Sequence, residues 1–153
     1  MRITILILLA ICFVLLQSNI PVNYMVYCEE HLSKAKALQI TTGVPVSIQF
    51  AQAIYESGGG RSNIAKKAKN HFGMRCGDDW QGARYYSKTG CWRQYDNVSL
   101  SYIDHACFLN EHYQNAVGKN WEYWSKLEGY GGAGYWQKIG KIVKRYKLYK
   151  YDL

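Results

Sequence analysis

The buried centre of the fold is encoded by one stretch, Val46-Ser-Ile-Gln-Phe-Ala-Gln-Ala-Ile-Tyr-Glu-Ser-Gly-Gly-Gly60. Apolar side chains fall on nearly every side of its first ten residues, which predicts a helix from Pro45 to Glu56 inside a domain. Pro45 suits the first turn of this helix and Gly58 suits its C-terminal stop. At that end the helix dipole and desolvation both raise the pKa of a carboxyl group. Because a carboxylic acid that stays protonated near neutral pH can act as a general acid, we predict that role for Glu56. The alternative is a glutamate that only solvates the helix end.

The length of 153 residues suits one domain with a real core. We interpret residues 1–22 as a signal peptide or an uncleaved N-terminal membrane anchor. The apolar run at residues 3–16 is short for a membrane span and fits the core of a signal peptide, but no clear small-x-small cleavage site follows it. Residues 3–16 could therefore remain as a membrane tether. We expect an exported protein, periplasmic or secreted, with residues 23–153 forming the catalytic domain.

Four cysteines follow the leader, Cys28, Cys76, Cys91 and Cys107, and an even number in an oxidising compartment favours disulfides. Of three possible connectivities we favour Cys76–Cys91, which would close the loop after the predicted helix, together with Cys28–Cys107. None of the four has the spacing of a zinc site, and we expect no metal or cofactor. A thiol nucleophile at Cys91 is disfavoured because this residue lies among strand-like residues instead of opening a helix.

The chain carries 19 Lys and Arg against 11 Asp and Glu, a net charge of +8 that indicates an anionic partner. The basic residues are spread along predicted helices, so we expect no nucleic acid, and export favours a cell-surface polymer. The 14 Tyr and 5 Trp suit sugar faces as well as a core. The stretch Gly129–Gly134 matches the dinucleotide pattern G-x-G-x-x-G, but no predicted strand leads into it, which excludes that site.

Hydrophobic periodicity predicts helices at residues 30–41, 45–56, 63–68, 100–110, 121–127 and 135–146. Two short strand-like runs, 83–86 and 91–95, flank a turn and predict a small hairpin. In the helix at 100–110 the expected buried face comprises Leu100, Ile103, Ala106 and Cys107. The order of elements predicts a mainly helical α+β domain with a small β-hairpin lobe.

Several longer motifs follow one another in a fixed order. They are Ala51-Gln-Ala-Ile-Tyr-Glu-Ser-Gly-Gly-Gly-Arg-Ser62, Ala68-Lys-Asn-His-Phe-Gly-Met-Arg75, Trp80-Gln-Gly82, Trp92-Arg-Gln-Tyr-Asp96, Asp104-His105 with Phe108-Leu109, Gly129-Tyr130, and Tyr146-Lys-Leu-Tyr-Lys-Tyr-Asp152. Together this order resembles the glucosaminidase family of peptidoglycan hydrolases, glycoside hydrolase family 73, in its Bacteroides-type form. The resemblance implies a lysozyme-like fold with a substrate groove between a helical and a β lobe. It also implies an endo-β-N-acetylglucosaminidase that cleaves the β-1,4 bond after N-acetylglucosamine in peptidoglycan.

By position in this resemblance, Glu56 is the general acid. Tyr130 matches a tyrosine that looks onto the scissile sugar, but the glycines that follow it depart from the family pattern, so Tyr135 is an equal candidate. Many members carry a second glutamate in the hairpin, whereas residues 80–95 contain no acidic residue. Asp78 and Asp79 are the nearest substitutes. Without them, the N-acetyl group of the substrate could itself attack the anomeric carbon.

Three more residues are predicted to bind or support the substrate. Phe72 and Trp80 resemble groove aromatics, although Phe72 would also suit a core. Gln52 lies one helical turn before Glu56 and could orient its carboxyl group. The rival functions are a lytic transglycosylase acting on the same polymer and a non-catalytic wall-binding module.

Overall fold

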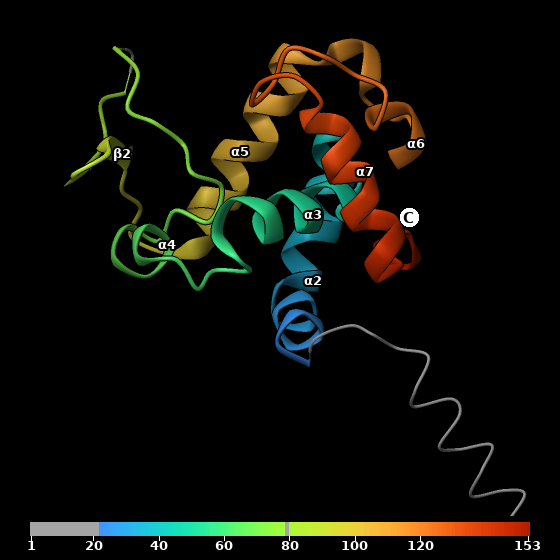
Figure 1. The fold of residues 1–153 in the computed structure, drawn as a ribbon, viewed down its shortest axis with the longest axis horizontal. Helices are drawn as coiled ribbons and strands as arrows, with labels where there is room; N and C mark the ends of the chain where they lie inside the picture. Colours follow the sequence, from blue (N-terminus) through green and yellow to red (C-terminus); the bar gives the residue numbers. More distant parts are fainter. Residues whose placement is uncertain (1–21, 79) are drawn as a thin grey trace, which may run out of the picture.

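Helix α3 (Val46–Ser57) lies at the centre of the molecule, as its apolar sequence predicts (Figure 1). The computed structural model describes residues 22–78 and 80–153. Ile48 and Phe50 are completely buried in α3, and burying each such side chain contributes about 1.5–3 kcal/mol. Gly58 ends the helix in the left-handed conformation, with its N–H bonded to the Ile54 carbonyl oxygen at 2.9 Å. The predicted stop is therefore confirmed.

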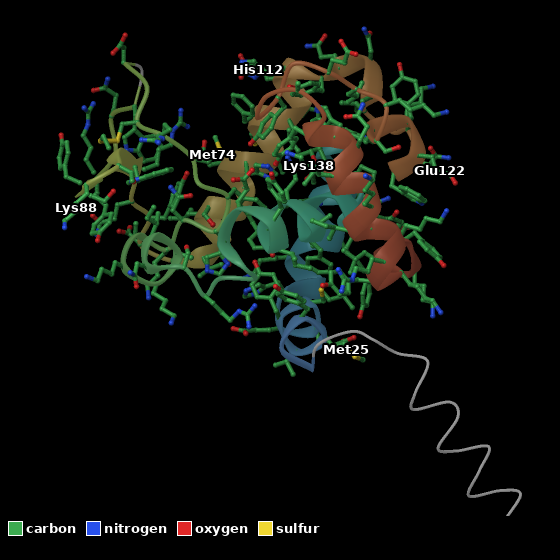
Figure 2. All side chains as sticks on the ribbon, in the orientation of Figure 1. Met25, Met74, Lys88, His112, Glu122 and Lys138 are labelled. Carbon is green, nitrogen blue, oxygen red and sulfur yellow. A yellow bond between two sulfur atoms is a disulfide. The ribbon has the colours of Figure 1, made fainter. Side chains whose placement is uncertain are left out.

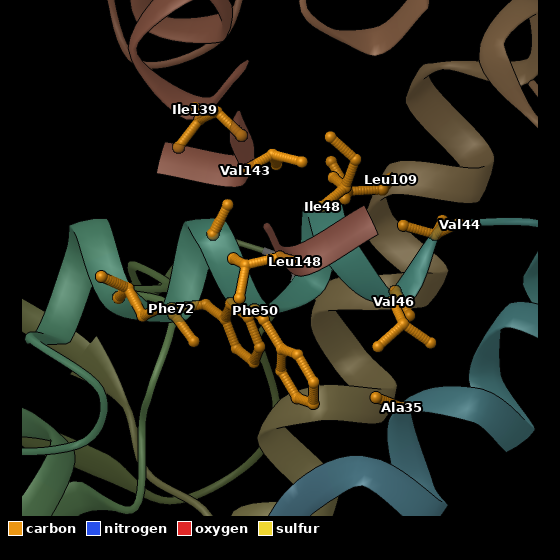
Figure 3. Close-up of a cluster of buried hydrophobic side chains, with 14 of the residues drawn as sticks. Ala35, Val44, Val46, Ile48, Phe50, Phe72, Leu109, Ile139, Val143 and Leu148 are labelled. Atoms are coloured by element: carbon orange, nitrogen blue, oxygen red, sulfur yellow. The ribbon is translucent and has the colours of Figure 1, made fainter. Parts of the chain in front are cut away.

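Three long helices form the helical lobe around α3: α2 (Val22–Thr42), α5 (Val98–His112) and α7 (Tyr135–Tyr146). Helices α2 and α7 pack directly on α3, and α5 packs on α2. The shorter elements are α4 (Asn63–Ala68), α6 (Trp121–Trp124) and the 3-10 helices η1 (Gln114–Ala116) and η2 (Leu148–Tyr151). Figure 3 shows the resulting core, in which side chains of α3 meet those of α5, α7 and η2. Compared with the prediction, α2 is longer and α6 is shorter.

The start of α3 is held by the end of the chain. Pro45 supplies no side-chain cap, and both carboxylate oxygens of Asp152 instead accept hydrogen bonds from Ser47, one from its backbone N–H and one from its hydroxyl, each at 2.7 Å. Gln39 accepts a third bond from the Val46 N–H at 3.0 Å. The first turn of a helix leaves its N–H groups without partners within the helix. Asp152 and Gln39 supply these partners and so fix the start of α3.

The β lobe is an antiparallel hairpin of β1 (Arg84–Ser87) and β2 (Gly90–Arg93), within two residues of the predicted strands. It lies to one side of the helical lobe, next to α4 (Figure 1). Cys76 and Cys91 form a disulfide that joins the loop before the hairpin to β2, as predicted. The mainly helical α+β class with a small hairpin lobe is confirmed.

The predicted pairing of Cys28 with Cys107 is wrong. Both residues are free thiols, and Cys28 is buried on α2 whereas Cys107 is exposed on α5. Burial raises the pKa of the Cys28 thiol to about 12. Cys107 is exposed because α5 turns a different side toward the core from the one predicted.

Helix α5 buries Ala106, as predicted, but the other three residues of the predicted face are exposed. Leu100 and Ile103 remain 40% and 45% exposed, while Tyr102 and His105 are completely buried. The Tyr102 hydroxyl is 2.7 Å from the hydroxyl of Tyr27, and the His105 ring stacks on the ring of Phe72. The rings of Tyr102 and His105 thus occupy the buried side of α5 in place of the aliphatic side chains of Leu100 and Ile103. Relative to the prediction, α5 is rotated about its axis, and Cys107 faces outward.

Within the described part of the chain, no helix is both long and apolar enough to cross a membrane. The predicted signal peptide or anchor falls almost wholly on residues 1–21, outside the described residues.

Candidate active site

Glu56 occupies the last turn of α3, half-buried between the two lobes. Burial raises the pKa of its carboxyl group, and a hydrogen bond from Tyr135 lowers it in part. The direction agrees with the sequence argument. A carboxyl group in this setting keeps its proton to a higher pH than an exposed glutamate would.

A buried chain of hydrogen bonds orients this carboxyl group. The Tyr135 hydroxyl, at the start of α7, donates to Glu56 Oε1 at 2.7 Å. Gln52 Nε2 in turn donates to the Tyr135 oxygen at 3.1 Å. Gln52 is 0% exposed, so its prediction as a substrate-binding residue is wrong. It lies on the same helix face as Glu56, as expected, but it acts on the carboxyl group through Tyr135.

The structure brings both candidate tyrosines to Glu56 in different positions. The rings of Tyr130 and Tyr135 lie 4.6 Å apart between centroids. Burial, and then the charge of Glu56, raises the pKa of both phenols, which keeps them protonated. Tyr135 is 2% exposed, whereas Tyr130 lines an open groove.

The loop opposite Glu56 is fixed by one asparagine. Asn70 Nδ2 donates to the carbonyl oxygens of Met74 and Arg93, both at 2.8 Å, and Asn70 Oδ1 accepts from the Met74 N–H at 3.0 Å. Within this loop Gly73 has a φ of +62°. A Cβ atom at Gly73 would lie 3.6 Å from Glu56 Oε2. The loop therefore places a glycine backbone beside the second carboxyl oxygen, in a left-handed conformation that other residues rarely adopt.

A groove of about 660 Å³ runs beside Glu56 between the two lobes. Gly73, which lies beside Glu56 Oε2, and Tyr130, whose ring lies 4.6 Å from that of Tyr135, both line it, whereas Glu56 itself is not among the lining residues. Figure 2 labels two other lining residues, Met74 and His112. The remaining lining residues are Arg75, Arg93, Phe108, Tyr113, Glu128, Gly129 and Gly131. A protonated carboxyl group beside such a groove can donate a proton to a bond held there, which is the chemistry of glycosidases.

Two predicted aromatic contacts lie elsewhere. Phe72 is 1% exposed and its ring stacks on His105 at 3.9 Å, so it belongs to the core and the groove prediction for it is wrong. Trp80 packs in the β lobe against Tyr95, with ring centroids 5.6 Å apart, and under the Arg93 guanidinium at 4.8 Å. It is half-buried and does not line the groove.

Of the two candidate second carboxylates, the structure describes Asp78 alone, which is exposed and does not line the groove. Asp79 lies outside the described residues. Of the described residues that line the groove, Glu128 is the one that carries a carboxylate. It was not predicted as a site residue. Its position directly before the Gly129-Tyr130 motif is the feature of the sequence that could have identified it as a groove residue.

Arg75 was also missed, although it ends the motif Ala68–Arg75. Within this motif a role was predicted for Phe72 alone. No group of His, Cys, Asp and Glu within residues 22–78 and 80–153 is arranged to hold a metal ion.

Residues 32–148 match the family model described as mannosyl-glycoprotein endo-beta-N-acetylglucosaminidase. The chain belongs to this glucosaminidase family, as the ordered motifs predict. No curated protein matches the sequence significantly.

Solved structures share the fold at low sequence identity. The catalytic domain of the autolysin Auto from Listeria monocytogenes is 21% identical, with a TM-score of 0.69 over 88% of this chain and 90% of that one. A peptidoglycan hydrolase from Sphingomonas sp. A1 is 22% identical, with a TM-score of 0.67 over 82% and 91%. The glycoside hydrolase domain of FlgJ from Salmonella typhimurium is 18% identical, with a TM-score of 0.66 over 81% and 88%. The lysozyme-like fold is thus confirmed.

Proposed function

We propose that this protein is an exported peptidoglycan hydrolase, an endo-β-N-acetylglucosaminidase that cleaves the β-1,4 bond after N-acetylglucosamine with Glu56 as general acid. The observation that carries the proposal is the setting of Glu56. One oxygen is held by the buried Tyr135, and the other lies beside Gly73 at the groove. Membership of the glucosaminidase family supports the reaction class. The similar Sphingomonas protein is a peptidoglycan hydrolase, which supports peptidoglycan as the polymer.

In this mechanism Glu56 gives its proton to the glycosidic oxygen as the bond to the anomeric carbon breaks. Tyr130, on the groove wall, would face the sugar on which positive charge develops. In the substrate-assisted course, the acetamido oxygen of the same sugar forms a bond to the anomeric carbon. Water then opens that ring, leaving its hydroxyl on the anomeric carbon and returning a proton to the Glu56 carboxylate.

We favour this substrate-assisted course over a second carboxylate. Asp78 is exposed and does not line the groove. Glu128 is exposed and lines the groove, but among the residues that the structure describes its side chain makes no hydrogen bond with Glu56. We therefore expect Asp78→Asn, Asp79→Asn and Glu128→Gln each to retain most of the wild-type kcat. A thiazoline analogue of the cyclised sugar should inhibit strongly, because an enzyme binds the charge and shape of its reaction intermediate more tightly than the substrate. A severe loss in one variant together with no thiazoline inhibition would identify that residue as a second catalytic carboxylate.

Tyr135→Phe is expected to change both the rate and its pH dependence. The Tyr135 hydrogen bond favours the ionised form of Glu56, so its loss raises the Glu56 pKa further. Since Glu56 must be protonated to act, kcat/KM falls as pH rises through that pKa, and the alkaline limb should move to higher pH in the variant. Loss of one hydrogen bond to a charged group should also lower kcat by about tenfold.

The measurement is a pH profile of kcat/KM on solubilised peptidoglycan. Tyr149→Phe, which removes an exposed hydroxyl on η2, serves as the control. An alkaline limb of Tyr135→Phe at unchanged or lower pH would contradict the assigned role of this hydrogen bond.

Purified sacculi test the proposal against a non-catalytic wall-binding module. We expect the wild-type protein to reduce the turbidity of a sacculus suspension and release soluble fragments. Cosedimentation with sacculi, without loss of turbidity and without released fragments, would instead favour the binding module. The lytic transglycosylase rival also reduces turbidity and differs in the sugar end that it leaves.

Export of the enzyme is part of the proposal. The Cys76–Cys91 disulfide fits an oxidising compartment outside the cytoplasm. We propose that residues 1–22 direct export, either as a cleaved signal peptide or as an anchor that tethers the enzyme to the membrane through residues 3–16.

A further inference from the structure

Arg75 projects a positioned guanidinium group from the β lobe. Its guanidinium carbon lies 3.8 Å from the centroid of the Trp92 ring, a close cation–π contact. Arg75 Nη1 also donates to the carbonyl oxygen of Thr89 in the hairpin turn. The backbone of Arg75 bridges to Trp92, and the next residue, Cys76, is joined to Cys91. The side chain is thus oriented by β2 before any ligand arrives.

No carboxylate of the residues that the structure describes neutralises the charge of Arg75. Arg93, the second arginine that lines the groove, donates from Nη1 to both carboxylate oxygens of Asp104 at 3.0 Å. In contrast, the contacts of Arg75 are to an aromatic ring and a neutral carbonyl group. Across residues 22–78 and 80–153, no carboxylate forms an ion pair with it. Because a guanidinium group has five N–H donors, most of its donors remain for a ligand.

The position of Arg75 relates it to the proposed proton donor. Both Arg75 and Gly73 line the groove, and Gly73 lies beside Glu56 Oε2. Two residues of extended chain span at most about 7 Å. The Arg75 backbone therefore lies within about 7 Å of the Gly73 backbone, so a group bound by the Arg75 side chain and the bond that Glu56 protonates would belong to the same glycan strand.

We propose that Arg75 is a specificity-determining residue that binds a carboxylate on the lactyl branch of a muramic acid residue near the scissile bond. This inference rests on the proposed function, since it takes peptidoglycan as the substrate. In that polymer the sugars alternate, and every second one carries the lactyl branch. The branch ends either in its own carboxylate or in a peptide that bears carboxylates. The planar fork of Arg75 fits a carboxylate in a bidentate manner, which an ammonium group does not reproduce.

Binding is measured in the Glu56→Gln background, so that the ligand stays intact. The ligands are soluble peptidoglycan strands in three forms: peptide-bearing, stripped of peptide by an amidase, and peptide-bearing with all carboxyl groups converted to amides. Arg75→Gln should raise the Kd for peptide-bearing strands by about tenfold or more. Arg75→Lys should recover only part of this loss. Arg84→Gln, in the neighbouring strand and off the groove, should match the parent.

The amidated strands decide the proposal. On them the parent and Arg75→Gln should bind equally weakly, because the carboxylate has been removed. An equal fold-loss for Arg75→Gln on untreated and amidated strands, or no loss on either, would overturn it. An Arg75 effect that is confined to peptide-bearing strands identifies a peptide carboxylate as the ligand. An Arg75 effect on peptide-stripped strands, where the amidase has freed the lactyl carboxylate from its amide bond, shows that the lactyl carboxylate is also bound.

Two controls separate this inference from other failures. A melting temperature near that of the parent, with the Cys76–Cys91 bridge intact, excludes misfolding of Arg75→Gln. Should that variant misfold, Arg75→Lys replaces it in the comparison of untreated and amidated strands, and its equal loss on both would overturn the proposal. Hydrolysis is assayed separately with Glu56 present. Carboxylate-dependent binding without hydrolysis would refute the proposed activity alone, whereas hydrolysis without an Arg75 effect on binding would refute this inference alone.

Discussion

Glu56→Gln is expected to abolish hydrolysis of peptidoglycan while leaving the fold and sacculus binding nearly unchanged. The amide keeps the shape of the carboxyl group and can still accept the Tyr135 hydrogen bond seen at 2.7 Å. It has no acidic proton to give to the leaving oxygen, and general acid catalysis contributes about 10²–10⁴ in rate. The assay is release of soluble fragments from sacculi, with the melting temperature measured in parallel.

The matched control is Glu122→Gln, which changes an exposed glutamate on α6 and should retain full activity. A Glu56→Gln enzyme that keeps more than about a tenth of the wild-type rate would exclude Glu56 as the general acid.

Removing the Cys76–Cys91 disulfide by a Cys76→Ser, Cys91→Ser double substitution is expected to destabilise the domain by about 3 kcal/mol. The two cysteines are 15 residues apart, and a cross-link that closes a loop of that size restricts the unfolded chain by about this much. The β lobe depends on this restriction because its hairpin has only two strands and none of their residues is buried.

The measurement is the free energy of unfolding in urea, for protein purified without reductant. Cys107→Ser, which removes an exposed free thiol, should change that energy by no more than about 0.5 kcal/mol. Peptide mapping without reduction should find Cys76 and Cys91 in one linked pair. Finding both as free thiols, or a double variant as stable as the parent, would contradict this account of the lobe.

The parts predicted correctly from sequence are those specified by neighbouring residues. The all-round apolar pattern gave α3, Gly58 gave its end, and the turn before Gly90 gave the hairpin. Each depends on interactions within a few residues along the chain, so a local pattern contains the information. The position of Glu56 at the end of α3 was predicted for the same reason, because that place is visible in the sequence.

The errors concern contacts between distant segments. The buried face of α5 was mistaken because Tyr102 and His105 find their partners on other elements, at Tyr27 and Phe72. His105 is so deeply buried that its pKa falls to about 3, and it fills the core as a neutral ring. A tyrosine or histidine in a helix pattern counts as half-polar, and only the partner decides whether it faces the core. The Cys28–Cys107 pairing failed through the same rotation.

The groove could be predicted only in part, because its walls come from separate regions of the chain. Arg75 comes from the loop before the hairpin, Phe108 from α5, and Tyr130 from the loop before α7. No spacing within the sequence relates these regions. The family resemblance supplied the existence of a groove and one of its tyrosines, whereas the hydrogen bond from Tyr135 to Glu56 required the packing of α7 on α3.

The most direct test of the central claim is the chemical identity of the new sugar end in a peptidoglycan digest. Purified peptidoglycan is incubated with the wild-type enzyme, the products are reduced with borohydride, and the released muropeptides are analysed by mass spectrometry. Hydrolysis of the bond after N-acetylglucosamine predicts reduced glucosamine at the new ends, with Glu56→Gln producing none. Reduced muramic acid would place the cleavage at the other glycosidic bond, and anhydro-muramic ends would make the protein a lytic transglycosylase, so either result would contradict the claim.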